Sequence, residues 1–214
     1  IIDILETYQN IFGTYGIHPH ETNKYKDISA DIIAKQLLKN KKIIGVGETG
    51  LDFYYNHSEA RIQKKVFLKH IEACQATSKP LIVHSRNAER DTLEILSSEK
   101  KNKNFDVLMH CFTGSKEFAH NLIDIDCYFS ASGVITFKKS TELAKTFKSI
   151  PNDKILVETD SPYLSPEPLR GKINVPSNIV HTVKFISILK ETTDEDVEKF
   201  TTNNFQKLFK INIA

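Results

Sequence analysis

The stretch KILVETDSPYL (residues 154–164) begins like a buried strand and then continues into two carboxylates. The apolar run at 155–157 has the composition of a short strand that is covered on both faces. Glu158 and Asp160 follow that run directly. The stretch therefore predicts a strand of a parallel sheet that carries acidic side chains at its carboxyl end.

Five further segments have the same plan, in which a short apolar run is joined to a polar or reactive side chain. Between them lie longer segments with apolar residues at three- and four-residue spacing, which is typical of amphipathic helices. This alternation predicts parallel α/β architecture. The further segments are residues 13–21, 42–50, 80–86, 106–114 and 127–134. The polar side chains at the six predicted strand ends are His18, Glu48, His84, His110, Ser130 and Asp160.

Two parallel α/β layouts fit this alternation. A doubly wound sheet usually concentrates its chemistry at one switch point, often with a glycine-rich phosphate loop, and the sequence has no Gly-x-Gly-x-x-Gly or Walker pattern. A TIM (β/α)8 barrel takes functional side chains from the ends of many strands, so we expect this fold class. Six predicted strands are two too few for a barrel, and residues 1–12 have a helical pattern. We therefore expect the first two strands to be missing from this chain.

Composition and charge narrow the class of protein. At 214 residues, we expect a single domain over residues 1–214 that is incomplete at its N-terminus. The formal net charge of +2 is too small to favour nucleic acid by itself. No apolar run approaches the roughly 18 residues of a membrane span, so no membrane partner is expected. Three widely spaced cysteines do not resemble a disulfide framework and favour a reducing cytoplasm.

Glu48, His84, His110 and Asp160, from four different predicted strand ends, form a candidate divalent-metal site. Imidazole suits zinc, and carboxylates accept magnesium, manganese or zinc. A carboxylate can bridge two ions, which together stabilise the attacking and leaving oxygens of a phosphoryl transfer. We therefore expect up to two divalent cations per chain around a common centre. None of the spacings is diagnostic, since there is no His-Glu-x-x-His or Cys-x-x-Cys pattern.

Each of these candidates also has a structural alternative. Glu48 could cap a helix, but the flanking glycines and the preceding apolar run favour a site residue. His84 and His110 could be core histidines, and their matching positions favour metal ligands. Asp160 could be a turn residue before a proline, and Glu158, on the same face of an extended strand, is expected to have a supporting role.

Further residues could contact a substrate. His18 in GIHPHE (residues 16–21) could touch a phosphate or a metal. The aromatic residues 53–55 could stack on bases, although core packing is the usual role of such side chains. Cys111 is adjacent to His110, and strand alternation predicts that it packs outward under a helix.

A polar loop (residues 165–178) follows the predicted strand that supplies Asp160, and it carries the donors Arg170, Lys172 and Asn174. Such clusters are usually solvated surface. Because guanidinium groups bind phosphates bidentately, and because this loop leaves a predicted site strand, we expect the three residues to bind substrate.

Five motifs together resemble the signature blocks of the TatD family of metal-dependent deoxyribonucleases. They occur in the family's order and are spread over nearly the whole chain. The motifs are GIHPHE (16–21), GVGETGLDFYY (45–55), PLIVHSRNAERD (80–91), LMHCFTGS (108–115) and VETDSPYLSPEPLRGKINVPSN (157–178).

The resemblance implies an amidohydrolase-like TIM barrel with a two-metal site that hydrolyses phosphodiester bonds of DNA, often from a 3′ end and on single strands. By motif, Glu48 is similar to the carboxylate that bridges the metals, and His84 and His110 are similar to ligands of the second metal. Asp160 is similar to a ligand of the first metal that also assists the attacking water. The residues similar to substrate-side positions are His18, Arg170 and Asn174.

One part of the family pattern is missing. The family begins with a His-x-His pair at the end of its first strand, which ligates the first metal, and this chain has no such segment. The gap agrees with the strand count. Either the chain is a portion of a longer protein, or it is a degenerate copy.

We therefore expect a metal-dependent 3′–5′ exonuclease that acts on DNA as a cytoplasmic monomer. Asp160 and Glu48 are the expected catalytic residues, with Asp160 orienting or deprotonating the attacking water, while Arg170 and Lys172 hold the neighbouring phosphate. Two other functions remain open. One is an amide or ester hydrolase, for example on aminoacyl-tRNA, because the same nucleophile attacks carbonyl carbon. The other is an inactive remnant.

Overall fold

The structure is a computed structural model that describes residues 1–55 and 57–212. The chain divides into two compact units, Ile1–Leu108 and Met109–Ala214. No described helix is both long and apolar enough to cross a membrane.

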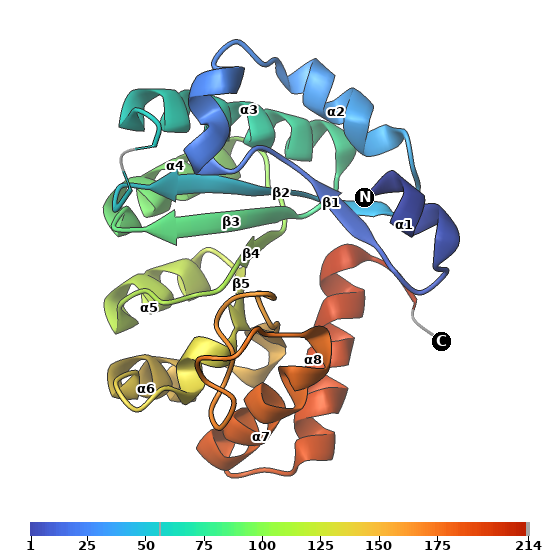
Figure 1. Cartoon of the computed structure of the whole chain (residues 1–214). Helices are drawn as coiled ribbons and strands as arrows, with labels where there is room; N and C mark the ends of the chain where they lie inside the picture. The colour runs from blue at the N-terminus through green and yellow to red at the C-terminus, as the bar shows by residue number, and fades with distance from the viewer. Residues whose placement is uncertain (56, 213–214) are drawn as a thin grey trace. The chain divides into compact units, whose positions relative to one another are not determined.

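Parallel strands form the centre of the first unit. β1 (Gly13–Tyr15), β2 (Ile43–Asp52) and β3 (Leu81–Arg86) are neighbours in that order, and both pairs are parallel (Figure 1). β4 (Val107–Met109) follows β3 in the strand order and contains the division between the units. Every residue of β2 except Glu48 is buried, which fits the apolar or small residues at most of its positions.

Two helices cover β2 in the first unit. α2 (Ala30–Leu38) and α3 (Ala60–Thr77) pack against each other and against β2 (Figure 1). α2 begins at Ser29, whose hydroxyl accepts the backbone N–H of Ile32 at 3.3 Å. The fully buried side chains on these two helices include Ile33, Leu37, Val66, Phe67 and Ile71. The other helices are α1 (Ile2–Thr7), α4 (Glu89–Asn102) and a 3-10 helix at Pro19–Tyr25.

The second unit has the same alternation. β5 (Cys127–Ala131) and β6 (Ile155–Val157) are parallel. Helix α8 (Asp194–Phe209) packs on β6 through Asn204, whose buried amide donates to the carbonyls of Asn152 at 2.8 Å and Ile155 at 2.7 Å. The other helices are α5 (Lys116–Asp124), α6 (Thr141–Ser149) and α7 (Ile179–Lys190), with 3-10 helices at Gly133–Thr136, Asn152–Lys154 and Pro176–Asn178.

These elements confirm the parallel α/β class. All six predicted strands are present among the described residues, and the expected helix at the start of the chain is α1. The described residues contain six strands, so the closed eight-stranded barrel stays a prediction.

Candidate metal centres

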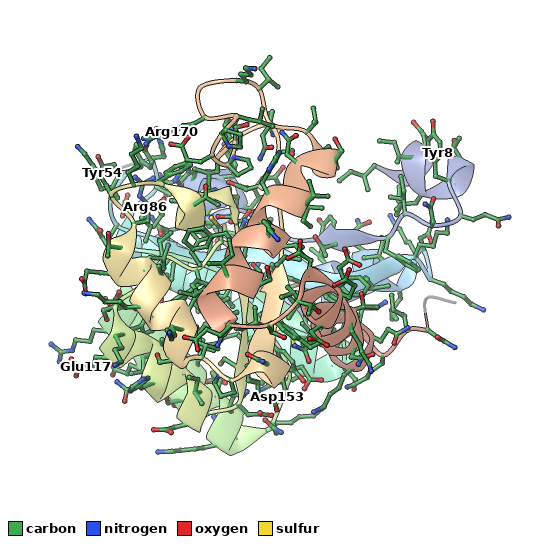
Figure 2. All side chains as sticks on the ribbon, turned by 90° about the horizontal axis from the view of Figure 1, so that it is seen from below. Tyr8, Tyr54, Arg86, Glu117, Asp153 and Arg170 are labelled. Atoms are coloured by element: carbon green, nitrogen blue, oxygen red, sulfur yellow. The ribbon has the colours of Figure 1, made fainter. Side chains whose placement is uncertain are left out.

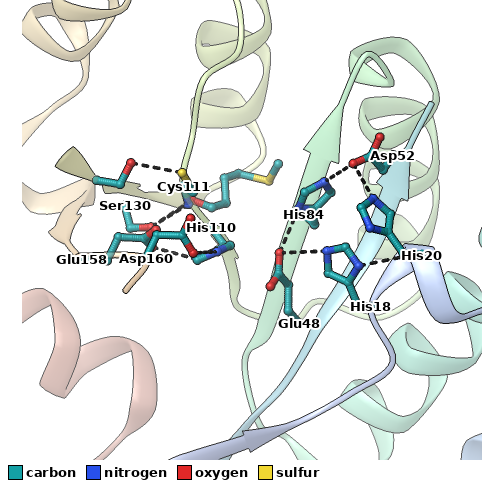
Figure 3. Close-up of polar contacts among 12 residues, drawn as sticks. His18, His20, Glu48, Asp52, His84, His110, Cys111, Ser130, Glu158 and Asp160 are labelled. Carbon is teal, nitrogen blue, oxygen red and sulfur yellow. Dashed lines mark hydrogen bonds and ion pairs between the residues drawn. The ribbon is translucent and has the colours of Figure 1, made fainter. Parts of the chain in front are cut away.

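The first unit brings together His18, Glu48 and His84. One candidate ligand atom from each of these side chains lies within 4.8 Å of the other two (Figure 3). His18 follows β1, Glu48 lies on β2 and His84 on β3. The parallel order of the three strands therefore places the three side chains at one edge, as the carboxyl ends of parallel strands predict.

Glu48 is positioned by an irregularity in β2. The sequence predicts Glu48 at the end of a strand, but β2 continues for four residues beyond it, to Asp52. The register between β2 and β3 shifts between Val46 and Thr49, that is, around Glu48. Such a shift re-aims a side chain locally, and it often occurs beside active sites. The glutamate therefore faces the site from within the strand.

Close approach of β2 and β3 fixes His84. Gly50 pairs with His84, has a φ of 135°, and a β-carbon on it would lie 2.1 Å from the carbonyl oxygen of His84. Only glycine combines this backbone conformation with that contact. The glycine allows the two strands to come together where the histidine is presented.

Both ring nitrogens of His84 face carboxylates. Its Nδ1 lies 2.9 Å from Oε1 of Glu48, and its Nε2 lies 3.1 Å from Oδ2 of Asp52 (Figure 3). A histidine that binds a metal with one nitrogen usually donates its other N–H to a carboxylate, which fixes the ring's tautomer and orientation. Asp52 is the carboxylate placed to accept the Nε2–H of His84.

Asp52 is itself firmly held. The residue is 0% exposed, and its Oδ1 accepts the backbone N–H groups of Tyr54 and Tyr55, each at 3.0 Å. Its Oδ2 is also 2.9 Å from Nε2 of His20. Burial raises the pKa of Asp52, but the hydrogen bonds from Tyr55 N–H, His20 and His84 together lower it below its ordinary value. Asp52 is therefore a fixed anion that orients two imidazole rings.

His18 is held as a neutral ring. Its Nδ1 accepts the backbone N–H of His20 at 3.2 Å, and its Nε2 lies 3.7 Å from Oε1 of Glu48. Burial lowers its pKa to about 4, although the Glu48 carboxylate acts in the opposite direction. Because Nδ1 accepts a hydrogen bond, the neutral ring carries its proton on Nε2. His18 therefore presents an N–H donor toward Glu48 in this state.

The backbone beside His18 is anchored by a buried histidine. The N–H of Ile17 donates to Nε2 of His70 at 3.0 Å, and Nδ1 of His70 donates to the carbonyl of Val66 at 2.8 Å. Burial lowers the pKa of His70 to about 4, so the ring is neutral near pH 7. His70 is thus a structural residue.

The second unit brings together His110, Glu158 and Asp160, again with ligand atoms within 4.8 Å of one another. Nδ1 of His110 lies 2.8 Å from Oε2 of Glu158, and its Nε2 lies 3.6 Å from Oδ1 of Asp160. Ser130 on β5 donates its hydroxyl to Oε2 of Glu158. The other carboxylate oxygen of Glu158, Oε1, is buried and has no hydrogen-bond partner among the described residues.

The backbone past β6 departs from the predicted strand. β6 ends at Val157, and Asp160 has a φ of 56° in the left-handed region, which aspartate tolerates better than most residues. Strand alternation therefore does not relate Glu158 to Asp160. Glu158 nevertheless contacts His110 more closely than Asp160 does, so its position is more central than a supporting role implies.

Both groups fit a divalent cation. Two ligands each about 2.1 Å from one ion lie at most about 4.2 Å apart, and the closest contacts within each group satisfy that limit. Histidine with carboxylate is a donor set that zinc, manganese and similar ions accept. The orphaned Oε1 of Glu158 adds a buried anionic oxygen that a cation would satisfy.

The predicted substrate loop divides into exposed and buried residues. Arg170 and Lys172 are exposed, and the guanidinium of Arg170 lies over the ring of Phe137 at 4.3 Å. Asn174 is only 2% exposed and donates its amide hydrogens to the carbonyls of Thr159 at 2.8 Å and Tyr163 at 2.7 Å. This corrects the expectation of a third available donor, because the amide of Asn174 braces the loop from within.

The structure groups the predicted ligands in two pairs, Glu48 with His84 and His110 with Asp160. His18 joins the first pair and Glu158 the second. Sequence reasoning missed Asp52 as a polar neighbour of the first group, and it missed the contact of Ser130 with Glu158. Asp52 carried one usable signal, its position four residues after Glu48 on the same strand.

The predicted strand stops before Cys111. β4 ends at Met109, so Cys111 lies beyond the strand with a φ of 42°. Its sulfur lies 3.1 Å from the hydroxyl of Ser132, and the residue is half-buried. Strand alternation therefore does not apply to it.

The chain is similar to several known metal-dependent hydrolases. A metal-dependent hydrolase of uncharacterised function from Buchnera aphidicola, BU355, is 43% identical over 97% of this chain and 80% of its own length. The uncharacterised metal-dependent hydrolase YcfH of Escherichia coli K12 is 38% identical over 99% of this chain and 78% of its own length. The crystal structure of YjjV, a TatD homologue from E. coli K12, has the same fold, with a TM-score of 0.90 over 99% of this chain and 81% of that chain at 22% identity.

A family model matches nearly the entire chain. The model describes TatD related DNases, and it matches residues 1–210. Both histidine–carboxylate groups lie inside the matched region. The chain therefore belongs to the TatD related DNase family of metal-dependent hydrolases.

Proposed function

We propose that this protein is a metal-dependent deoxyribonuclease that hydrolyses phosphodiester bonds of DNA, acting as a 3′–5′ exonuclease on single strands. The observation that carries the proposal is the presence of two histidine–carboxylate groups in a chain of the TatD related DNase family. DNA, in particular single strands and 3′ ends, is the proposed partner. We also propose that the protein acts as a monomer in the cytoplasm and that its fold class is the (β/α)8 barrel.

The proposed cofactors are up to two divalent cations per chain, drawn from magnesium, manganese and zinc. Glu48 and His84 would hold one cation, and His110, Glu158 and Asp160 would hold the other. A divalent cation bound to such ligands neutralises phosphate charge and lowers the pKa of the attacking water.

The side chains supply orientation and proton transfer. Asp160 would accept a proton from the attacking water, for which its half-buried carboxylate beside His110 is suited. Asp52 holds Nε2 of His84 and keeps the orientation of the ring fixed during the reaction, whereas Nδ1, which faces Glu48, is the nitrogen that would bind the cation. His18 would donate a hydrogen bond from its Nε2–H to a phosphate oxygen, and Arg170 and Lys172 would hold the neighbouring phosphate.

A cleavage assay with defined metals tests the proposal. A single-stranded oligonucleotide labelled at its 5′ end should be shortened stepwise from its 3′ end in the presence of magnesium, manganese or zinc. Glu48→Gln and Asp160→Asn should each lower the rate by at least about 100-fold, because each removes a ligand charge or the proton acceptor. Asp27→Asn, on an exposed aspartate paired with Lys65, is the matched control.

The same preparation decides between bond types. An aminoacyl ester substrate and a carboxamide substrate, incubated with the same metals, should remain intact. Hydrolysis of either substrate without cleavage of DNA would overturn the proposal in favour of an acyl hydrolase, and inactivity on all substrates would indicate a remnant.

A further inference from the structure

An exposed aromatic and cationic cluster lies beside the first metal centre. The guanidinium carbon of Arg86 lies 4.0 Å from the centre of the Tyr54 ring and 4.8 Å from that of Tyr55. The two tyrosine rings are perpendicular, with centres 4.8 Å apart. We call these three residues the tyrosine–arginine platform; Figure 2 shows Tyr54 and Arg86 next to each other.

The platform is exposed although its side chains are large. Tyr54 is 54% exposed and Tyr55 is 40% exposed, and Arg86 is also exposed. Core packing, the usual role of aromatic residues after a strand, therefore does not explain these two tyrosines. Their rings keep apolar area that a planar ligand could cover.

Hydrogen bonds to a buried carboxylate hold the backbone of the two tyrosines in the platform. The backbone N–H groups of both tyrosines donate to Oδ1 of Asp52, and Arg86 is the register partner of Asp52 in the β2–β3 pair. The platform is thus fixed by the same buried carboxylate that orients His84. A surface ordered before binding loses less conformational entropy when a ligand arrives.

Arg86 points toward the same face as the first metal centre. It follows His84 by two residues on β3, and residues two apart on a strand share a face. Their backbone positions are about 6.6 Å apart, so nearby parts of one nucleic-acid strand can reach both side chains. A strand with a phosphate at His84 would therefore bring a base or phosphate of a nearby nucleotide to Arg86.

The charge of Arg86 remains available to a ligand. Within the described part of the chain, no carboxylate forms an ion pair with its guanidinium, which contacts the two tyrosine rings. A guanidinium in contact with aromatic rings can still donate to phosphate oxygens through its N–H groups, and a base can stack on its exposed face.

We propose that the tyrosine–arginine platform binds a nucleobase of single-stranded DNA by stacking and the adjoining phosphate through Arg86. The inference rests on the proposed function, because it assigns the base-binding surface of the same substrate. Stacking on a ring or guanidinium face uses no base-specific hydrogen bonds, so binding tolerates any sequence. A single-stranded substrate is favoured because paired bases within a duplex do not expose their faces.

Equilibrium binding without metal tests the platform apart from cleavage. The full chain in excess chelator is titrated with a single-stranded oligonucleotide that carries the fluorescent base 2-aminopurine, and with a matched strand in which most positions are abasic. The wild type should bind the base-bearing strand more tightly than the abasic one. Tyr54→Ala and Tyr55→Ala should each weaken binding of the base-bearing strand by roughly tenfold to a hundredfold, and they should leave binding of the abasic strand nearly unchanged.

A conservative variant separates stacking from charge. Arg86→Lys keeps the positive charge but loses the planar guanidinium, so it should weaken binding of the base-bearing strand more than that of the abasic strand. Tyr8→Ala is the matched control, since Tyr8 is also 54% exposed and lies outside the platform (Figure 2). Unchanged circular dichroism would show that each variant folds.

The outcomes distinguish the two proposals. If the platform variants bind both strands as tightly as the wild type, the proposed base-binding role of the platform is wrong, even when the enzyme cleaves DNA. If base-dependent binding is lost in the variants but the wild type with metals does not cut DNA, the platform stands and the proposed nuclease function falls. In a cleaving enzyme, the platform variants should raise KM while changing kcat less than twofold.

Discussion

Asp52 is not a candidate ligand of the first metal centre, but it orients the ring of His84, which is one. It is buried, anionic and bonded to the rings of both His20 and His84. Asp52→Asn keeps the shape but removes the charge, so His84 should become a weaker ligand. We expect metal affinity to fall by about tenfold to a hundredfold, measured by competition with a chromogenic zinc or manganese chelator.

A control keeps this prediction specific to the site. Asp27→Asn removes the same charge from an exposed position and should leave metal affinity unchanged. Equal affinities in Asp52→Asn and the wild type would show that the carboxylate does not act through His84.

His70 predicts how stability depends on pH. Its pKa is about 4 in the folded protein and about 6.5 in the unfolded chain, so the unfolded state binds more protons between these values. The stabilisation from keeping this ring neutral is therefore complete above about pH 6.5 and is lost as the pH falls toward 4. Between pH 7 and pH 4.5 this loss should lower the free energy of unfolding by about 2 kcal/mol, measured in urea.

A glutamine variant isolates the contribution of His70. His70→Gln retains an acceptor for Ile17 and a donor for Val66 but does not titrate in this range. Its free energy of unfolding should fall less between pH 7 and pH 4.5 than that of the wild type. Equal losses in both proteins would assign the pH dependence to other groups, such as His18, whose pKa is also lowered to about 4.

At the scale of elements, the contact between β2 and β3 depends on Gly50. A side chain there would meet the carbonyl of His84 and would require a φ that only glycine adopts readily. Gly50→Ala should lower the free energy of unfolding by about 3 kcal/mol, measured by urea denaturation. It should also weaken metal binding, because His84 moves with its strand. Ala34→Gly, in helix α2, should cost only about 1 kcal/mol and leave metal binding unchanged.

The loop between β6 and α7 has its own internal support. Asn174 is buried and donates to two carbonyls of this loop. Asn174→Ala leaves both carbonyls without these donors, so the loop should open more often and be cut faster by a protease at residues 161–178. Asn104→Ala, on an exposed asparagine, is the control and should be cut at the wild-type rate.

Elements could be predicted from sequence better than the positions of individual side chains. Short apolar runs predicted all six described strands, and the structure brings Glu48 together with His84 in the first unit and His110 together with Asp160 in the second. The register shift at Glu48 and the left-handed turn at Asp160 could not be predicted, because both depend on backbone geometry that pattern rules do not encode. Asn174 was misjudged because a polar loop residue is usually exposed, and its burial arises from the folding of the loop on itself.

At the scale of the whole molecule, cation binding should be visible as stability. A ligand that binds only the folded state stabilises it by about 2.7 kcal/mol when its concentration is 100 times its Kd. Removing divalent cations with a chelator should therefore lower the melting temperature and abolish catalysis. The circular dichroism spectrum at low temperature should remain that of a folded α/β protein. Adding back manganese or zinc should reverse both effects. A melting temperature that does not change when the chelator is added would contradict cation binding.

Stoichiometry tests the assignment of ligands to the two groups. Calorimetric titration of the wild type should give up to two cations per chain. Glu48→Gln should lose the cation of the first group, and Glu158→Gln should lose that of the second, since each change removes the negative charge of a ligand carboxylate. A wild-type stoichiometry in both variants would show that the cations bind elsewhere.

The link between α8 and β6 has a consequence for synthesis on the ribosome. Asn204 holds the carbonyls at the start of β6, yet it is made more than forty residues after Glu158 and Asp160. The nascent polypeptide therefore carries these two acids before the helix that braces their strand has emerged from the exit tunnel. The second cation-binding group should mature only after translation is almost finished, whereas the first can assemble as soon as β3 has been released.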